Sequence, residues 1–566
     1  MSAPNVIIIG GGAAAIAMAH TLKHKLGFNN FEELGGTWRV NTYPGCGSDV
    51  PIHLYSFSFN LNPDWTQALA DQEEILRCRS CSVSPLTPYI FPCTLRFYPL
   101  THAAADIENT VDKFSLRSHF RFKVECTGAE WVDGSWHVHF LDTYTGEKFT
   151  KQCTILLSAV GGFSIPRQSK FPGMDKYKGR TFHTAEWDHT FGWRNKKVAV
   201  IGNGCSAAQV VPSIAPGVKK LVQYARSPQW YHPRPNRVFS SFEKFCFRYV
   251  PLYQRYHRLD LFLQTDDLAS VYGPEEKQIK KRLATEAEAR SYILSEAPKK
   301  YHHFIVPDFP LGCKRRIYDP GYLAALRRDN VELLPEGIQE FTETGLISEK
   351  GKPEDFDAVI LATGFNVSSF LAPMNIIGKT GEELQDQWSN RRGAQAYMGT
   401  FVHNNPNFAI LFGPNTFPAF NSVIYAIEVQ VDYITSVFVK PIIDGYTHVV
   451  EVKEDAEEGF IQNLDRVLGE TVFSAGCSNW YINKAGRNSA AWPGEAATFW
   501  KATYFPTWSH FLWTGCSSFW MLRKAWRHLK TTSLLSWLAL LAGTWYTMSQ
   551  GLLAGPFETL VRPFKA

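Results

Sequence analysis

The sequence lacks the features that mark nucleic-acid-binding, metal-binding or secreted proteins. The net charge is only +5 over 566 residues, and no long basic run in the body of the chain indicates a nucleic-acid partner. The eleven cysteines are scattered, and Cys78–Cys81 is a CxxC without a second pair to complete a metal site. A buried-strand pattern opens at Val6 with no leader before it, so we expect no secretory signal. These absences predict an intracellular, cytoplasmic protein with reduced thiols and no bound metal.

The chain is longer than one ordinary core requires and suits two nucleotide-binding domains with additional segments. Aromatic residues make up 14% of it and include 17 Trp. This content suits a protein that binds planar ligands or an apolar substrate, and it suits a large aromatic core equally well.

Two strand–glycine–helix units lie far apart in the chain. The first has an apolar strand at 6–9 followed by GGGAAA at 10–15, and the second has a strand at 198–201 followed by GNGCSA at 202–207. A third apolar strand, 357–361, runs into the sequence ATGF at 362–365. Such repeated units predict an α/β fold with two Rossmann-like dinucleotide-binding domains. We assign the first unit to FAD and the second to a nicotinamide cofactor.

Both glycine motifs have the residue types that a dinucleotide pyrophosphate requires. The first glycine permits a tight turn, and the second lets the pyrophosphate approach a helix N-terminus, where free N–H groups favour anions. A small third residue lets helix and strand pack closely. The candidate FAD ligands are Gly10, Gly12 and Ala15, and the candidate nicotinamide-cofactor ligands are Gly202, Asn203, Gly204, Cys205, Ser206, Ala207, Ala208 and Gln209.

A cation follows the second motif where an NAD-binding domain would place an acid. Arg226 and Ser227 stand at the end of the apolar run that follows the second helix. Arginine at this place favours the 2′-phosphate of NADPH, although a single Arg at a strand end is commonly just solvated. We expect Arg226 and Ser227 to bind NADPH.

The pattern divides the chain into four parts. We expect the first part of the FAD domain at 1–165 and an NADPH domain at 166–345 with a helical insertion near 235–300. The second part of the FAD domain is expected at 346–500, and a C-terminal tail at 501–566.

The tail contains a long uncharged run. Basic residues precede Leu534–Leu553, which has twenty residues without a charge. A helix of this length can span a bilayer, and the basic flank would then face the cytoplasm. A C-terminal hydrophobic helix that anchors the chain is therefore one expectation. A helix packed on the catalytic domains or lying on the membrane surface is the alternative.

Two stretches depart from the expected pattern. Only residues 28–34 separate a helix stop at Gly27 from Gly35, and they span at most roughly 25 Å, too little for a second Rossmann strand with a loop. Glu32 and Glu33 stand where the ribose acid belongs, without the strand to present them. Residues 78–104 hold four prolines and three cysteines without periodicity. We expect a gene-model fault, an irregular excursion at 78–104 and weak FAD binding; a natural surface insertion is the alternative.

Further motifs give a family resemblance. GGTW at 35–38, four residues, YPG at 43–45, three residues and Asp49 match a fingerprint of the Baeyer–Villiger monooxygenases at each fixed position. Tyr177-x-Gly179-x-x-x-His183-x-x-x-Trp187-Asp188 resembles the other fingerprint, with Tyr where Phe is usual. LATGF at 361–365 resembles the family's ATG strand. The chain is thus similar to class B flavin monooxygenases over roughly residues 5–500. Within them it resembles fungal-type enzymes of secondary metabolism, which also carry VPxHLYSF, here at 50–57.

The resemblance implies FAD and NADPH as cofactors and gives roles to residues at matching positions. Gly312-Cys313-Lys314-Arg315 resembles the segment in which the Lys contacts the NADP phosphate and the Arg lies over the flavin. His183 is expected to order the link between the domains. The residues expected to line FAD are Gly36, Thr37, Trp38, Arg39, Val40, Gly47, Ser48, Asp49, Val50 and Tyr55.

The implied reaction inserts one oxygen of O₂ beside the carbonyl of a ketone, which becomes an ester or lactone. Arg315 is the catalytic candidate, because a permanent cation stabilises negative charge at the reacting oxygen. Asp49 would orient Arg315 by a bidentate pair, and bound NADP⁺ would exclude water. A bulky apolar ketone is expected by analogy. Two alternatives stay open: an N- or S-hydroxylating flavin monooxygenase, indicated by Tyr177, and an inactive flavoprotein, indicated by the missing strand.

Overall fold

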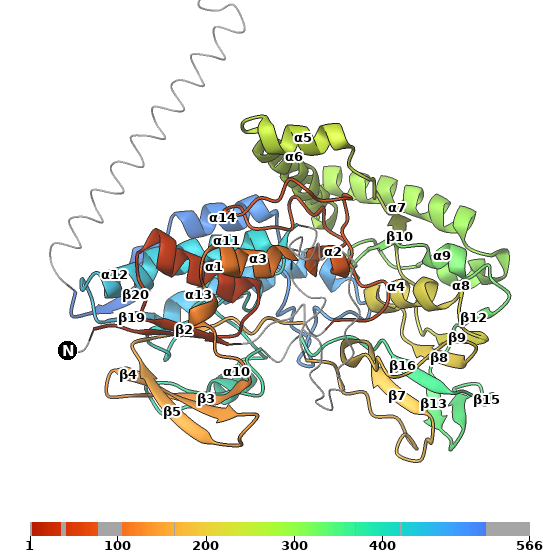
Figure 1. The fold of residues 1–566 in the computed structure, drawn as a ribbon, viewed down its shortest axis with the longest axis horizontal. Helices are drawn as coiled ribbons and strands as arrows, with labels where there is room; N and C mark the ends of the chain where they lie inside the picture. Colours follow the sequence, from red (N-terminus) through yellow and green to blue (C-terminus); the bar gives the residue numbers. More distant parts are fainter. Residues whose placement is uncertain are drawn as a thin grey trace, which may run out of the picture.

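The computed structural model describes residues 3–34, 41–76, 105–163, 165–367, 370–418 and 421–516. Two α/β domains lie side by side (Figure 1). The insertion predicted at 78–104 and the hydrophobic run 534–553 lie outside the described residues, so both stay predictions. Among the described residues, no helix is long and apolar enough to cross a membrane.

A four-stranded parallel sheet forms the base of the first domain. Its order is β18 (Phe408–Ile410), β6 (Ile155–Ser158), β1 (Val6–Ile9) and β2 (Phe31–Leu34). Every residue of β1 and β6 is buried, because both faces of the sheet are covered, as is usual for parallel sheets.

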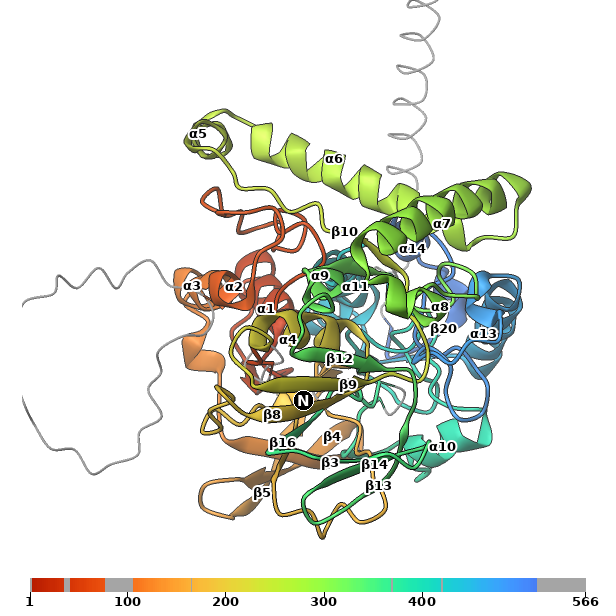
Figure 2. The ribbon, with the colours of Figure 1, turned by 90° about the vertical axis from the view of Figure 1, so that its right-hand side faces the viewer.

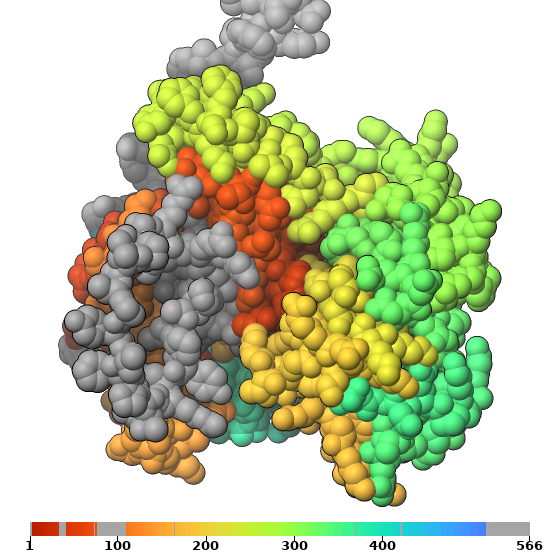
Figure 3. Space-filling model, turned by 45° about the vertical axis from the view of Figure 1, so that its right-hand side comes forward, coloured from red at the N-terminus to blue at the C-terminus, as the bar shows by residue number. Residues whose placement is uncertain are grey.

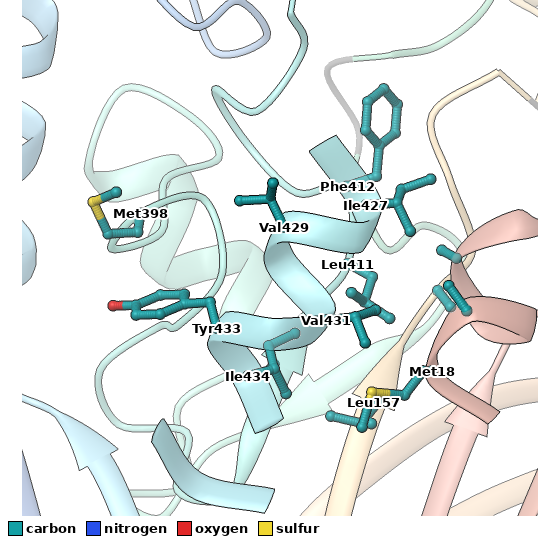
Figure 4. Packing of buried hydrophobic residues seen from close by; sticks show 14 of the residues in the cluster. Met18, Leu157, Met398, Leu411, Phe412, Ile427, Val429, Val431, Tyr433 and Ile434 are labelled. Carbon is teal, nitrogen blue, oxygen red and sulfur yellow. The ribbon is translucent and has the colours of Figure 1, made fainter. Parts of the chain in front are cut away.

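Two helices cover one face of this sheet: α1 (Ala13–His20) and α11 (Val423–Ile434). Figure 4 shows side chains of both helices meeting those of the strands, among them Met18, Leu157 and Val431. A mixed sheet covers the other face, in the order β17 (Asn375–Ile377), β3 (Val124–Val132), β4 (Ser135–Asp142) and β5 (Lys148–Cys153), with β17 parallel to β3 and the other pairs antiparallel. The core of this domain therefore has two layers, one on each side of β1.

The second domain has its own parallel sheet, in the order β12 (Val331–Leu334), β9 (Lys220–Tyr224), β8 (Lys197–Ile201), β16 (Ala358–Leu361) and β7 (Arg180–His183). The second glycine motif leads from β8 into α4 (Cys205–Ile214). Helices α5 (Ser241–Tyr249), α6 (Tyr253–Asp267) and α7 (Glu276–Glu296) occupy the predicted helical insertion. They lie along the upper edge of the molecule (Figures 1 and 2).

Shorter elements complete both domains. In the first they are α2 (Gln72–Leu76), α3 (Ala105–Lys113), α10 (Leu384–Asn390), α12 (Lys440–Ile443), β19 (Val449–Val452), α13 (Glu454–Gly469), α14 (Ala496–Tyr504) and β20 (Phe511–Thr514). In the second they are β10 (Tyr231–Pro233), α8 (His302–Ile305), β11 (Ile317–Asp319), α9 (Tyr322–Ala325), β13 (Ile338–Phe341), β14 (Gly345–Ser348) and β15 (Pro353–Asp355).

The second strand of the first domain is present, and the expectation that too little chain remained for it is wrong. A π-helical turn, Thr21–Lys25, extends α1, and Gly27 has a φ of +65°. The chain reverses there, and β2 begins at Phe31, paired in parallel register with Val6. The strand needs only four residues because hardly any loop precedes it. One ground for expecting weak FAD binding, and for the inactive alternative, is thereby removed.

Of the two candidate ribose acids, Glu32 is already engaged. Its carboxylate accepts a hydrogen bond of 2.6 Å from Nζ of Lys151 on β5. Glu32 therefore points toward β5 of the mixed sheet.

The domain boundary expected at 345/346 falls too early. Strand β16 lies between β8 and β7 in the second sheet, with Leu361 opposite both Ile201 and His183. The chain rejoins the first domain by β17, which pairs with β3. The sequence reading failed here because the apolar strand 357–361 fits either sheet equally well.

Candidate active site

The first glycine turn leaves no room for a side chain. Gly10 has a φ of +118°, and a Cβ added there would lie 2.4 Å from the backbone oxygen of Ala159. Gly12 is the N-cap of α1, with no side chain capping the helix. Free backbone N–H groups at this helix start suit a pyrophosphate, and Ala15, fully buried, keeps α1 close to the sheet. These residues fit FAD.

The second glycine turn repeats the same geometry. Gly202 has a φ of +115°, and a Cβ there would lie 2.4 Å from the backbone oxygen of Ala362. Gly204 is the N-cap of α4, and a Cβ on Gly204 would meet no atom within 4 Å. The space in front of α4 is thus open to a ligand, which fits a second dinucleotide.

A cavity of about 560 Å³ lies between the two turns and takes residues from both domains. The predicted site residues that line it are Gly12, Gly47, Ser48, Asp49, Val50, Tyr55, Asn203, Gly204, Cys205, Ser206, Gln209, Arg226, Ser227, Lys314 and Arg315. Ala207 and Ala208 are fully buried in the core behind α4. Gly36, Thr37, Trp38, Arg39 and Val40 lie outside the described residues, so their assignment stays a prediction.

Arg315 and Asp49 form an ion pair in this cavity. Nε and one terminal nitrogen of Arg315 donate to the same oxygen of Asp49, Oδ2, at 3.1 and 2.7 Å. The two residues are 266 positions apart, so only the closure of the two domains brings them together. Burial alone would lower the pKa of Arg315, but the charge and hydrogen bond of Asp49, together with Cys205 and Tyr481, outweigh burial and raise it. The guanidinium therefore keeps its charge at every working pH.

Beside Arg315, the thiol of Cys205 stays protonated. Burial and the charge of Asp49 raise its pKa to about 11. Cys205 therefore brings no charge to the first turn of α4, and the cation of Arg315 is not neutralised by a thiolate.

A cationic pocket also lines the cavity. Lys314 Nζ donates to Ser227 Oγ at 2.6 Å, and Arg226 is exposed beside them. Burial lowers the pKa of Lys314, and the neighbouring cation Arg226 lowers it too, against the opposing charge of Asp308. A bound phosphate would offset both unfavourable effects. The pocket therefore fits the 2′-phosphate of NADPH.

The YPG segment of the fingerprint holds the two domains together, a role that the motif alone does not disclose. Tyr43 OH donates to Gln209 Oε1 at 2.8 Å, and Gln209 Nε2 donates to the backbone oxygen of Gly47 at 3.0 Å. Gly45 has a φ of +81°, and a Cβ there would lie 2.6 Å from the backbone oxygen of Gln209. Tyr43 and Gly45 thus let this loop lie directly on α4.

An aromatic wall faces Arg315, and sequence reasoning missed it. Phe163, Phe417 and Trp480 form a cluster with ring centroids 5.1 to 6.0 Å apart. The guanidinium carbon of Arg315 lies 5.3 Å from the centre of the Phe417 ring. All three rings line the cavity. No motif marks them, because they come from distant loops that share only this cavity.

The expectation of reduced thiols is wrong at two positions. Cys313 and Cys477 form a disulfide, with their Cα atoms 6.1 Å apart. It joins the segment of Lys314 and Arg315 to the segment that bears Trp480. The two cysteines are 164 positions apart in the sequence, which explains why their spacing gave no sign of the pairing.

The second fingerprint lies away from the cavity. Tyr177 OH donates to the backbone oxygen of Phe356 at 2.8 Å, and the ring belongs to the core of the second domain. The hydroxyl that departs from the usual Phe is therefore bound by the fold, which weakens the case for a hydroxylating enzyme. His183 ends β7 and contacts Phe365, with ring centroids 5.9 Å apart, at the chain's crossing between domains.

Comparison with known proteins agrees with this geometry. The family model described as flavin-binding monooxygenase-like matches residues 160–378. A Baeyer-Villiger monooxygenase of Pseudomonas aeruginosa is 33% identical over 500 residues, which cover 86% of this chain and 87% of the relative. The FAD-binding monooxygenase ktnD of Aspergillus niger is 31% identical, covering 91% of this chain and 82% of the relative.

Solved structures share the fold. The complex of OTEMO with FAD and NADP superimposes with a TM-score of 0.75 at 21% identity, covering 91% of this chain and all of that one. Cyclohexanone monooxygenase from Rhodococcus sp. Phi1, bound to NADP⁺, gives a TM-score of 0.74 at 24% identity, covering 91% of this chain and 99% of that one. The chain belongs to the flavin-dependent monooxygenases of the Baeyer–Villiger family, which use FAD and NADPH.

Proposed function

We propose that this chain catalyses the Baeyer–Villiger oxidation of a bulky apolar ketone to an ester or lactone. The observation that carries the proposal is the Arg315–Asp49 ion pair in a cavity between two dinucleotide-binding turns. A fixed cation at this place suits oxygen insertion at a carbonyl, because negative charge develops on oxygen during the reaction. The resemblance to fungal-type enzymes supports a role in secondary metabolism.

A flavin reduced by NADPH supplies the activation of O₂ when it is bound in the first domain. Arg315 then supplies a permanent positive charge, because its guanidinium does not release its proton. Asp49 holds the guanidinium in one orientation and so acts as a positioning residue. Lys314 and Arg226 would hold the phosphate of NADPH, and the bound cofactor would help to exclude water from the cavity.

The chemical class of the substrate is inferred from the aromatic wall. Phe163, Phe417 and Trp480 offer flat apolar surfaces opposite Arg315. A ketone with a ring or long apolar chain would pack its body on these rings and present its carbonyl oxygen to the guanidinium. A small hydrophilic ketone would leave the wall in contact with water.

The test compares chemistry at Arg315 with the preceding reduction step. In Arg315→Ala, NADPH should still reduce the bound flavin within a few-fold of the normal rate. Ester formation should fall by about a hundredfold or more, the usual effect of removing an oriented charge that stabilises a developing anion. Arg315→Lys, which keeps the charge but loses the planar fork, should lie between the two.

Product analysis decides between the two kinds of oxidation. Purified enzyme is given a ketone panel and, separately, an amine and a sulfide, and mass spectrometry detects the gain of one oxygen. An ester yield from Arg315→Ala equal to that of the unaltered chain would refute the role of Arg315. Oxidation of the amine or sulfide alone would refute the proposed reaction. A cytoplasmic location stays a prediction from the sequence.

A further inference from the structure

Helix α6 carries its apolar side chains outward. Leu252, Tyr256, Leu259 and Leu263 are 74%, 68%, 53% and 58% exposed. Leu252 directly precedes the helix. Tyr256, Leu259 and Leu263 are spaced at i, i+3 and i+7, so these three form one stripe along it. A helix packed on a protein core normally turns such a stripe inward.

Polar side chains on the inner side of the same helix bind the rest of the protein. Gln254 Nε2 donates to the backbone oxygen of Asn62 at 2.7 Å. The carboxylate of Asp266 accepts hydrogen bonds from the backbone N–H of Ala496 and from Asn421 Nδ2, at 2.6 and 3.2 Å. These contacts fix the orientation of α6, so the outward direction of Leu259 and Leu263 is built into the fold.

Helix α5 extends the apolar surface. Phe242, Phe245 and Tyr249 are each more than half exposed, at spacings of three and four residues along one side. Figure 2 shows α5 and α6 on the upper edge of the molecule, outside both sheets. In Figure 3 they form the upper end of the visible face. The seven side chains on α5 and α6 together are called the outer face below.

The chemistry of the outer face suits a lipid surface. Tyr, Phe and Leu are the residues that interfacial helices place at the boundary between headgroups and acyl chains. Charges of both signs lie among them in the sequence, and Arg255 and Asp260 are exposed. Beyond the last described residue, the chain also contains the uncharged run 534–553 behind a basic flank. Two moderate membrane signals together give the stable attachment that one alone does not.

A second cavity lies directly beneath α6. It has a volume of about 410 Å³, and the inner side of α6 lines it with His257, Leu261 and Gln264. The same cavity reaches Asp49 and Arg315. Gln264 is exposed, whereas the Arg315 side chain is only 19% exposed. The cavity therefore leads from the surface beside the outer face to the guanidinium.

We propose that the outer face of α5 and α6 docks on a lipid surface, and that the cavity beneath α6 admits an apolar ketone from the bilayer to Arg315. The docking half depends only on the exposed side chains of α5 and α6 and not on the proposed function. The entry half rests on the proposed function.

Vesicle flotation tests the docking half. The full chain is mixed with vesicles of phosphatidylcholine containing phosphatidylserine, and the bound fraction is measured. The triple variant Phe245→Ser, Tyr256→Ser, Leu259→Ser should bind at least about tenfold more weakly, because three apolar side chains leave the membrane. The matched control Tyr144→Ser, Leu283→Ser removes side chains that are 81% and 57% exposed elsewhere, and it should bind as the unaltered chain does.

Hydrogen exchange locates the contact. Peptides from α5 and α6 should exchange more slowly in the presence of vesicles, and their rates without vesicles should not depend on protein concentration. Equal binding by the triple variant, or unchanged exchange in α5 and α6, would overturn the docking half and leave attachment to another segment. Concentration-dependent protection without lipid would instead assign the outer face to a second copy of the chain.

A constriction in the cavity tests the entry half. Leu261→Trp should raise the KM for a bulky apolar ketone by about tenfold relative to a small cyclic ketone, with kcat for the small ketone preserved. An equal KM ratio in variant and unaltered enzyme would overturn entry beneath α6. If the unaltered enzyme oxidises no ketone at all, the proposed function fails, whereas the flotation result stands by itself.

Discussion

The two glycine turns offer a matched pair of substitutions with separable outcomes. Gly10→Ala and Gly202→Ala each add one carbon atom at a φ near +115 to +118° and 2.4 Å from a backbone oxygen. A non-glycine residue in such a conformation costs on the order of 1–3 kcal/mol. The overlap with backbone must also be relieved, because β6 and β16, which precede the clashing oxygens, are buried strands.

Relief of the overlap should move the start of α1 or of α4, where the pyrophosphate binds. We expect Gly10→Ala to lose FAD by at least about a hundredfold in affinity, a penalty of about 3 kcal/mol. The Gly202→Ala variant should keep FAD bound. Its KM for NADPH should rise by a factor similar to the loss of FAD affinity in Gly10→Ala. Flavin absorbance of the purified protein measures the first effect, and steady-state oxidation of NADPH measures the second.

Gly27→Ala is the control. Gly27 also has a positive φ, +65°, but a Cβ there meets no atom within 4 Å. This variant should lose about 1 kcal/mol of stability and retain FAD. The reasoning would be refuted if Gly10→Ala purified with stoichiometric flavin, or if both turn variants lost the same cofactor.

Two further predictions concern charge. Arg226→Ala should raise the KM for NADPH at least tenfold more than that for NADH, because only NADPH carries the 2′-phosphate; equal effects on both cofactors in steady-state assays would exclude this reading. Burial lowers the pKa of His53 to about 3, so the unfolded chain binds more protons than the folded chain between that value and about 6.5. The free energy of unfolding is therefore not reduced by His53 above about pH 6.5, and it decreases as the pH falls below that value. His53→Gln should reduce the loss of unfolding free energy between pH 6.5 and 5 by about 2 kcal/mol, measured by urea unfolding; an unchanged loss would contradict it.

The cofactor turns and the ion pair were predictable because each depends on local constraints. Gly10 and Gly202 are specified by backbone geometry within a few residues, and the fingerprint brings Asp49 into the site by fixed spacing. The pairing of Asp49 with Arg315 came from a family resemblance, which carries long-range information that spacing does not.

The features that sequence reasoning missed depend on contacts between distant segments. Phe163, Phe417 and Trp480 have no shared pattern, and their rings meet only after both domains fold. Strand β2 was missed for a different reason, because a π-helical turn before Gly27 shortens the connection. Hydrophobic periodicity could suggest that α6 is a helix, but not that its polar side faces the protein.

The disulfide has a consequence for large-scale motion. Cys313 belongs to the second domain and Cys477 to the segment that returns to the first, so a covalent ring closes around the cavity. Any sliding of one domain over the other must then pivot about this bond, next to Lys314 and Arg315. The segment that bears Lys314 and Arg315 therefore moves together with the segment that bears Trp480, so the guanidinium and the aromatic wall keep their mutual position when the domains shift.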